Sequence, residues 1–393
     1  MRIGIDVDAV GYVREKAGLY SHLVGLLRGL AETTPCPAVT LYMLGGDPEG
    51  RRRVDEFVAE HRLRLPVVEY RPPRRRPYRL RAWAAGVRCG LARLDAFLTV
   101  SCPGFPPGSR RVNAYLIPDL SSRHAAAHHM AGNRAHWEGV FAAARANADV
   151  VFTYSEHTRR QVIAELGQPA ERVVAVPLAA AAAYRPRAEA EVAAQLRELG
   201  LAYRGYVLAV GTLEPRKNHL TLFRAYADYL RRPGAPQLPL AVVGPRGWMD
   251  EPILAEPARL GIADKVRFLG RVPDLSAVYA GAAAAAYLSV YEGFGLPPLE
   301  AMSSGTPTVT SDATSLPEVV GDAGLLVRPD DVTGTADALY RVLTDAAVWA
   351  DLSARGLRRA AGFSWRATAE GYVAAIRMAA ARKRRHRQPA GVA

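Results

Sequence analysis

The amino-acid sequence predicts an α/β protein made of two doubly wound domains, each a parallel sheet with helices on both faces. Its 393 residues exceed the roughly 100–200 residues of one domain, and 49% hydrophobic with 23% charged residues is a globular composition. Short, continuously apolar runs alternate with segments of helical periodicity, which is typical of parallel strands buried on both faces. The same alternation starts again after residue 200, so a second domain is expected.

The expected strands form two sets of six. Those of the first half are Ile3–Val7, Val39–Leu44, Ala96–Val100, Asn113–Ile117, Val150–Tyr154 and Val173–Val176. Those of the second half are Tyr206–Val210, Leu240–Val243, Val266–Leu269, Ala284–Leu288, Thr308–Thr310 and Leu325–Val327. Helices are expected over Gly18–Leu30, Leu220–Leu230 and Trp365–Ala381. We place the domains at residues 1–185 and 186–365, followed by a helix and basic tail at 366–393.

Composition excludes several classes of protein. Three widely spaced cysteines, Cys36, Cys89 and Cys102, indicate neither a disulfide framework nor a zinc site. No apolar run reaches the roughly 20 residues of a membrane span, and the N-terminus does not have the pattern of a signal peptide. We therefore expect a cytoplasmic protein, with the inner face of the membrane as the alternative location.

The net charge of +13 is unevenly distributed. Eight arginines and no acid lie between Arg71 and Arg93, and Arg382–Arg385 forms a second basic cluster. Such runs favour contact with an anionic surface, here peripheral contact with an anionic membrane. The alternative is a solvated face in an arginine-rich chain, because 47 arginines accompany only four lysines. Nucleic acid is the poorer partner, since only Tyr78 and Trp83 could stack on bases.

Two loops at strand ends carry the chemistry. In the first, Gly211 lets the backbone approach a ligand, and Arg216 and Lys217 supply the two cations that a diphosphate requires. The second follows a strand and opens a helix; its glycines expose amides that suit a phosphate. Glu292 precedes this helix and Glu300 lies within it, a spacing that could bracket a nucleotide sugar. A third loop, Ser311–Gly324, brings hydroxyls and Glu318 to the same rim.

Metal, kinase and dehydrogenase motifs are weak or absent. Asp6 and Asp8 have the D-x-D spacing of metal-dependent transferases, but a strand-end or acceptor-loop role is preferred. The histidines His124, His128, His129 and His136 lack ligand spacing with acids or cysteines. The sequence contains no P-loop and no well-placed dinucleotide-binding glycine motif. Neither a metal nor another cofactor is expected.

The segments GTLEPRKN, VRFLGRV, EGFGLPPLEAMSSGTPTVTSDATSLPEVVGDAG and FSW together resemble glycosyltransferase family 4, of the GT-B fold. The resemblance is dense over residues 203–366 and loose before them. It implies two Rossmann-like domains facing across a cleft, with a C-terminal helix that crosses back to the first. It also implies retaining, metal-independent transfer of a sugar from a nucleotide diphosphate sugar, with acceptor binding by the first domain and donor binding by the second.

The resemblance also implies roles for individual residues. Glu292 would contact the donor sugar, Glu300 the ribose hydroxyls, and Arg216 and Lys217 the leaving diphosphate. Amides would come from Gly293, Phe294, Gly295 and Leu296, while the segment from Phe268 through Gly270, Arg271 and Val272 would flank the base. In the first half, Asp119 matches a catalytic position, and Gly18, Tyr20, His124 and Ser155 are the candidates on the acceptor and sugar side. Pro118 stands where the family has histidine, and His124 is the candidate to replace it.

We expect a hexosyltransferase, with GDP-mannose the favoured donor because GTLEPRKN resembles mannosyltransferase-type members. The alternatives are a UDP-sugar-dependent transferase, a GT-B nucleotide-sugar epimerase and a catalytically weak nucleotide-sugar-binding pseudoenzyme. The acceptor is a lipid-linked glycan, a polysaccharide or a small molecule.

Overall fold

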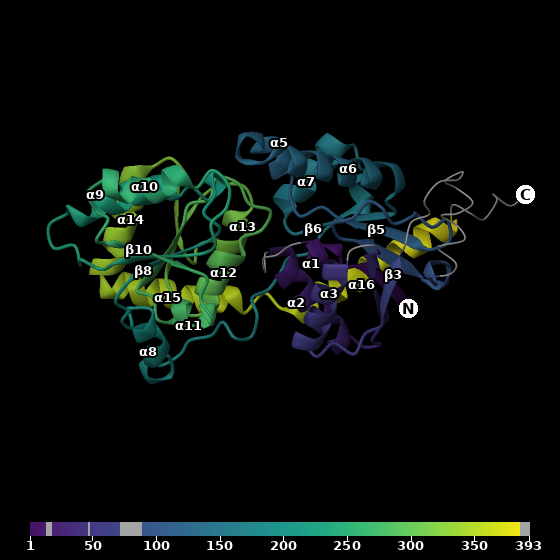
Figure 1. Cartoon of the computed structure of the whole chain (residues 1–393), viewed down its shortest axis with the longest axis horizontal. Helices are drawn as coiled ribbons and strands as arrows, with labels where there is room; N and C mark the ends of the chain where they lie inside the picture. Colours follow the sequence, from purple (N-terminus) through teal and green to yellow (C-terminus); the bar gives the residue numbers. More distant parts are fainter. Residues whose placement is uncertain (13–17, 46–47, 71–88, 386–393) are drawn as a thin grey trace, which may run out of the picture. The chain divides into compact units, whose positions relative to one another are not determined.

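Two α/β units make up the chain in the computed structural model, which describes all residues except 13–17, 46–47, 71–88 and 386–393 (Figure 1). The first unit contains residues 1–120, 130–178 and the C-terminal segment from Trp365. The second contains 179–364 together with the short segment 121–129. The chain therefore leaves the first unit and returns to it, so its C-terminal helix belongs to the unit that contains the N-terminus.

The first unit has a seven-stranded parallel sheet in the order β3-β2-β1-β4-β5-β6-β7. The strands are β1 (Arg2–Asp6), β2 (Ala38–Leu44), β3 (Val67–Tyr70), β4 (Ala96–Thr99), β5 (Val112–Leu116), β6 (Val150–Thr153) and β7 (Val173–Ala175). Its α-helices are α1 (Asp8–Tyr12), α2 (Gly18–Glu32), α3 (Pro48–Glu60), α6 (Ala131–Asn147), α7 (Glu156–Leu166) and α16 (Trp365–Arg385).

The second unit has a six-stranded parallel sheet in the order β10-β9-β8-β11-β12-β13. The strands are β8 (Val207–Val210), β9 (Leu240–Val243), β10 (Val266–Gly270), β11 (Ala284–Tyr287), β12 (Thr308–Ser311) and β13 (Leu325–Val327). Its α-helices are α5 (Ser121–His124), α8 (Glu189–Glu198), α9 (His219–Leu230), α10 (Glu251–Arg259), α11 (Leu275–Ala280), α12 (Leu296–Ser303), α13 (Leu316–Val320), α14 (Val332–Thr344) and α15 (Ala346–Ala360).

Alternate residues along the strands of the second sheet pack into two separate hydrophobic cores, one on each face of the sheet. Val207 and Ala209 pack with α9 and α14 on one face, whereas Leu208 packs with α8 and α11 on the other. Successive side chains of a strand point to opposite faces, so a strand covered on both sides must be apolar throughout. This requirement explains the unbroken apolar runs that predicted the fold.

All twelve expected strands are present, with ends that differ from the prediction by at most one residue. The structure adds β3, which pairs with β2 at the edge of the first sheet. This strand has only four residues and contains Glu69, so the sequence offers no long apolar run to identify it.

Helix α16 packs closely on α2 of the first unit. A Cβ atom placed on Gly25 would lie 2.0 Å from the Trp365 ring, and one on Gly29 would lie 2.1 Å from the Trp365 carbonyl oxygen. Buried Tyr372 contacts buried His22 of α2, with 3.2 Å between the hydroxyl and Nε2. The two glycines of α2 therefore create the space that α16 occupies.

The C-terminal end of α16 is tied to the first unit by part of its basic cluster. Lys383 Nζ lies 2.5 Å from Asp149 Oδ2 and 2.8 Å from the Arg111 carbonyl oxygen. Arg382 donates to the Asp149 carbonyl, while Arg384 and Arg385 are exposed. Seven of the eight arginines expected to form the other basic run lie at 71–88, outside the described residues. Within the part of the chain that is described, no helix combines the length and apolarity needed to cross a membrane.

Candidate active site

The strand order of the second unit identifies the edge where a ligand is expected. Strands β8 and β11 are neighbours at the point where the chain reverses its direction of winding. In doubly wound sheets, ligands bind outside the carboxyl ends of strands at such a switch point. The loops that follow β8, β11 and β12 carry Arg216 and Lys217, Glu292, and Thr314 and Ser315, respectively. Three segments widely separated in sequence thus contribute polar side chains to one edge.

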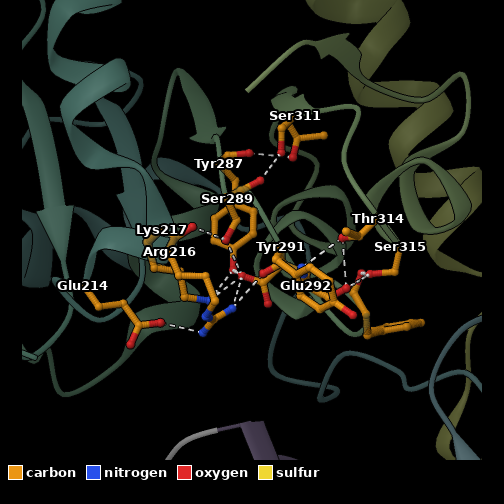
Figure 2. Close-up of polar contacts among 12 residues, drawn as sticks. Glu214, Arg216, Lys217, Tyr287, Ser289, Tyr291, Glu292, Ser311, Thr314 and Ser315 are labelled. Atoms are coloured by element: carbon orange, nitrogen blue, oxygen red, sulfur yellow. Dashed lines mark hydrogen bonds and ion pairs between the residues drawn. The ribbon is translucent and has the colours of Figure 1, made fainter. Parts of the chain in front are cut away.

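Glu292 is the centre of this cluster (Figure 2). Its Oε1 atom lies 2.6 Å from Lys217 Nζ and 2.9 Å from Arg216 Nη1. The same oxygen lies 2.7 Å from the Tyr287 hydroxyl and 2.5 Å from Ser289 Oγ. One carboxylate oxygen has two lone pairs, and these four donors crowd it. A substrate hydroxyl approaching Glu292 would therefore meet Oε2.

Charge fixes the protonation state of this carboxylate. Burial alone would raise the pKa of Glu292, but Arg216 and Lys217 outweigh burial and lower the pKa to about 2. Burial, with repulsion from Arg216, lowers the pKa of Lys217, while Glu292 opposes that change. Because Glu292 is ionised at all ordinary pH values, it is suited to stabilise positive charge and unsuited to donate a proton.

Backbone contacts hold the Glu292 loop in place. The Glu292 amide donates to Thr314 Oγ1 at 2.9 Å, and Ser315 Oγ lies 2.7 Å from the carbonyl oxygen of Phe294. Ser311 Oγ donates to the Ser289 carbonyl. These hydroxyls come from the third loop, which the sequence placed at the same rim. They orient the carboxylate through its own backbone.

The loop that carries the two cations has its own supports. Glu214 is buried and lies 2.5 Å from Arg216 Nη2, so Arg216 has a carboxylate on each side. Asn218 adopts a left-handed conformation with φ of 57° and donates to the carbonyls of Leu288 and Pro329. Asparagine tolerates this conformation better than most residues. The turn directs Arg216 and Lys217 toward Glu292.

Helix α12 begins next to this cluster, as predicted. Gly295 precedes its first residue with φ of 128°, and a Cβ there would lie 2.7 Å from Leu316. Only glycine adopts that φ readily. Pro297 and Pro298 have no N–H groups, so a phosphate at this terminus would use the amides of Gly293–Leu296.

Glu300 lies one turn further along α12. Burial raises its pKa to about 7, while the nearby hydroxyls of Tyr279 and Tyr184 act in the opposite direction. The two glutamates of this segment therefore differ: the pKa of Glu292 is lowered by neighbouring cations, and the pKa of Glu300 is raised by burial. The other expected donor-side residues lie at two strand ends: Gly211 follows β8, Gly270 ends β10, and Arg271 and Val272 follow it.

The acceptor-side residues predicted from sequence lie in both units. Gly18, Tyr20 and Ser155 belong to the first unit, as does Asp119, which the sequence predicted to be catalytic. The Tyr20 hydroxyl contacts Glu60 and His61 of the same unit, and Ser155 caps α7 by accepting from the Thr158 amide. These contacts give Tyr20 and Ser155 structural roles; their acceptor-side role stays a prediction.

His124 belongs to the second unit. Its ring is parallel to that of Tyr291, with 5.8 Å between centroids. The same short segment is attached through Trp248, whose indole nitrogen donates to the His128 carbonyl at 2.5 Å. His124 therefore lies beside the residue that precedes Glu292, which the sequence could not show.

Asp6 organises the switch point of the first sheet. Its carboxylate accepts from the amides of Val100, Ser101 and Cys102 after β4, and from that of Asp8. Asp8 in turn accepts from the amide of Leu44, the last residue of β2. These contacts give the D-x-D pair the strand-end role that the sequence favoured. Among the described residues, no group of three or more histidine, cysteine or acidic side chains could hold a metal.

Three members of the cluster, Tyr287, Ser289 and Glu214, were not predicted from the sequence. Tyr287 ends an apolar strand, and the neighbouring residues Ala284–Ala286 are all core residues. Glu214 lies two residues before Arg216 in the segment GTLEPRKN, and this proximity could have indicated that it belongs to the site. Tyr287 had no such signal, because only the folded structure shows that its hydroxyl faces the loop.

Comparisons with known proteins show which sequences and folds this chain resembles. Residues 204–345 match the family described as "Glycosyl transferases group 1". The chain is 43% identical over 223 residues to O-antigen chain mannosyltransferase B of Escherichia coli, covering 56% of this chain and 58% of that protein. It is 38% identical over 236 residues to D-inositol 3-phosphate glycosyltransferase of Nocardia farcinica, covering 58% and 52%. The chain thus spans about half the length of these curated relatives.

Solved structures establish the fold over nearly the whole chain. HepE of Anabaena, crystallised in complex with UDP and glucose, matches with a TM-score of 0.76 at 18% identity, covering 96% of this chain and all of that one. WaaG, a glycosyltransferase involved in lipopolysaccharide biosynthesis, matches with a TM-score of 0.67 at 16% identity, covering 95% and 98%. We conclude that this chain has a GT-B fold, and that residues 204–345 of its second unit are similar to the glycosyltransferase group 1 family.

Proposed function

We propose that the protein transfers a hexosyl group from a nucleotide diphosphate sugar to an acceptor hydroxyl, with retention at the sugar carbon and without a catalytic metal. The observation that supports this most is the cluster in which Arg216 and Lys217 meet Glu292 at the switch point of the second sheet, with each side chain only 12–15% exposed. Two preorganised cations suit a leaving diphosphate, and a permanently ionised carboxylate suits a sugar carbon that becomes positive.

The proposed reaction breaks the bond between the sugar carbon and the diphosphate oxygen, and that electron pair leaves with the diphosphate. A new bond forms between the same carbon and the acceptor oxygen on the same face of the sugar. The acceptor proton passes to the departing diphosphate. Glu292 is a poor proton acceptor because its pKa is about 2, so its part is to stabilise charge through Oε2.

GDP-mannose is the proposed donor, supported by the mannosyltransferase named among the relatives. UDP-sugars are the alternative, because HepE was crystallised with UDP. For the acceptor we propose a lipid-linked glycan or polysaccharide, in keeping with the O-antigen relative, with a small molecule as the other outcome. We propose acceptor binding by the first unit and donor binding by the second, whose boundary lies at residues 178–179 and not at the expected 185–186.

The test measures melting temperature against a panel of GDP-, UDP- and ADP-sugars, because a ligand that binds the native state raises it in a concentration-dependent way. Release of nucleoside diphosphate from the stabilising donor is then followed with and without acceptor. A transferase releases it, an epimerase converts the sugar without needing an acceptor, and a pseudoenzyme shows stabilisation alone. Excess chelator should leave the release of nucleoside diphosphate unchanged. If chelator abolished this release and manganese restored it, the proposal of metal-free transfer would be contradicted.

A further inference from the structure

Tyr287 connects the two charged groups at the centre of the cluster. Its hydroxyl lies 2.7 Å from Lys217 Nζ and 2.7 Å from Glu292 Oε1. The side chain is buried, and burial raises the pKa of Tyr287 well above its ordinary value. The hydroxyl is therefore neutral, with a single hydrogen to donate.

The direction of each hydrogen bond follows from this proton count. An ammonium group has only donors, and an ionised carboxylate has only acceptors. Lys217 must donate to the Tyr287 oxygen, and Tyr287 must donate to Glu292. The chain of bonds thus runs from cation to anion through one hydroxyl, alongside the direct 2.6 Å contact between them.

Geometry makes this arrangement specific to tyrosine. Tyr287 is the last residue of β11, so the sheet fixes its backbone, and Lys217 Nζ also lies 5.2 Å from the centre of its ring. Lys217, in contrast, is a flexible side chain on a short loop. A rigid aromatic ring that extends from the sheet can hold the ammonium at one position.

We infer that Tyr287 is a positioning residue that holds Lys217 and Glu292 in their working geometry, and that its hydroxyl, together with Glu292, stabilises the charged form of Lys217 in a largely buried site. This inference rests on the proposed function for its kinetic consequence, but its structural part can be measured without any substrate. The other charged or titratable groups near Lys217 are Arg216 and Glu214 on its own loop, Glu292, and His219 at the start of α9.

The first experiment reads the pKa of Lys217 directly. The chain contains only Lys16, Lys217, Lys265 and Lys383, so NMR of protein with ¹³C-labelled lysine gives four side-chain signals that single Lys→Arg variants assign. In Tyr287→Phe the ammonium loses an acceptor, so the protonated form is less favoured and the midpoint of Lys217 moves to lower pH. The signals of Lys265 and Lys383 should not move.

Tyr206→Phe is the matched control. It removes the hydroxyl of another buried tyrosine of the second unit, which donates to the Val278 carbonyl away from the cluster. It should reproduce any general loss of stability without changing the Lys217 midpoint. An unchanged Lys217 midpoint in folded Tyr287→Phe, or an equal shift in the control, would overturn the inference.

The second experiment is kinetic. Loss of one hydrogen bond to a charged group predicts a fall in kcat of about 10- to 150-fold for Tyr287→Phe, with little change in KM. The alkaline limb of the pH profile should move to lower pH, in the same direction as the Lys217 midpoint. If the wild type consumes no nucleotide sugar, the proposed function fails while the NMR result still decides the role of Tyr287. A normal kcat with an unshifted limb would contradict the inference alone.

Discussion

At the scale of single residues, the cluster predicts that Lys217 and Glu292 fail in different ways when replaced. Lys217→Ala should weaken donor binding and lower kcat/KM by about 100- to 1000-fold, because one preorganised cation is lost at the diphosphate. Lys265→Ala is the matched control, since Lys265 is a partly exposed lysine of the same unit that pairs with exposed Asp264. Steady-state kinetics of both variants give the comparison, and equal activities would refute the role of Lys217.

Glu292→Gln should slow turnover by a similar factor and yet strengthen binding of free nucleoside diphosphate. The carboxylate neutralises Arg216 and Lys217 in the unliganded site, and glutamine leaves both cations available to the anion. Calorimetric titration with nucleoside diphosphate, beside kcat from the same preparation, would show the two opposite changes. Weaker binding together with normal turnover would be incompatible with this assignment.

Glu300 predicts a pH effect on stability. Its pKa is raised from 4.5 to about 7 in the folded protein, so between these values the folded state holds a proton that the unfolded chain releases. The free energy of unfolding therefore falls as the pH rises through this window. Glu300→Gln should be less sensitive to pH, with its gain over wild type greatest at pH 8. Urea melts at pH 5 and pH 8 test this; parallel wild-type and variant curves would argue against it.

The sequence predicted the charged members of the site better than the neutral ones. Arg216, Lys217 and Glu292 stand in loops between strongly patterned elements, where charge is conspicuous and points to a ligand. Tyr287 and Ser289 occupy a strand end and the residues just after it, where a tyrosine or serine is normally part of the core. Their role depends on the direction in which the side chain points at the end of the strand. The pattern of neighbouring residues in the sequence does not determine that direction.

At the scale of secondary-structure elements, the contact between α2 and α16 predicts a large effect from one methyl group. Gly25→Ala should destabilise the protein by about 1–3 kcal/mol or more, because the new Cβ overlaps the Trp365 ring. Gly132→Ala in α6 is the control: no atom lies within 4 Å of its Cβ position, and alanine favours a helix. Urea unfolding should show a loss for Gly25→Ala and little change or a gain for Gly132→Ala.

The strands were predictable because burial on both faces demands an unbroken apolar run, and only an edge strand escapes this demand. Strand β3 is such a strand, and it was missed. The assignment of residues 121–129 to the second unit was also beyond sequence reasoning. It depends on contacts with Trp248 and Tyr291, which are more than 100 residues away. No sequence pattern around these two residues indicates which segment they contact.

At the scale of the whole molecule, the proposed contact with anionic membrane needs revision in one respect. Lys383 and Arg382 bind groups of the first unit, so the C-terminal cluster offers chiefly Arg384 and Arg385 to a surface. A membrane contact would then depend mostly on the arginines between Arg71 and Arg93, seven of which lie outside the described residues.

The revised proposal predicts that the protein co-sediments with anionic vesicles at low salt and less at high salt, since each basic residue contributes about 1 kcal/mol near such a surface. Replacing Arg74 and Arg75 by serine should reduce this binding. The same change at Arg231 and Arg328, two exposed arginines of the second unit, should not. Equal, negligible binding to anionic and neutral vesicles at both salt concentrations would reject the membrane contact.

The return of α16 to the first unit has a consequence for how the protein is made. His22 and Tyr372 are in contact but separated by 350 residues of chain. At a synthesis rate of about 5–20 residues per second, roughly 20–70 s pass between the emergence of the two from the ribosome. The face of α2 that α16 covers stays uncovered during that time, and the second unit has its complete sequence before α16 is made. The unit translated first is therefore the last to be completed, and a nascent chain stalled before Trp365 should be a substrate for chaperones.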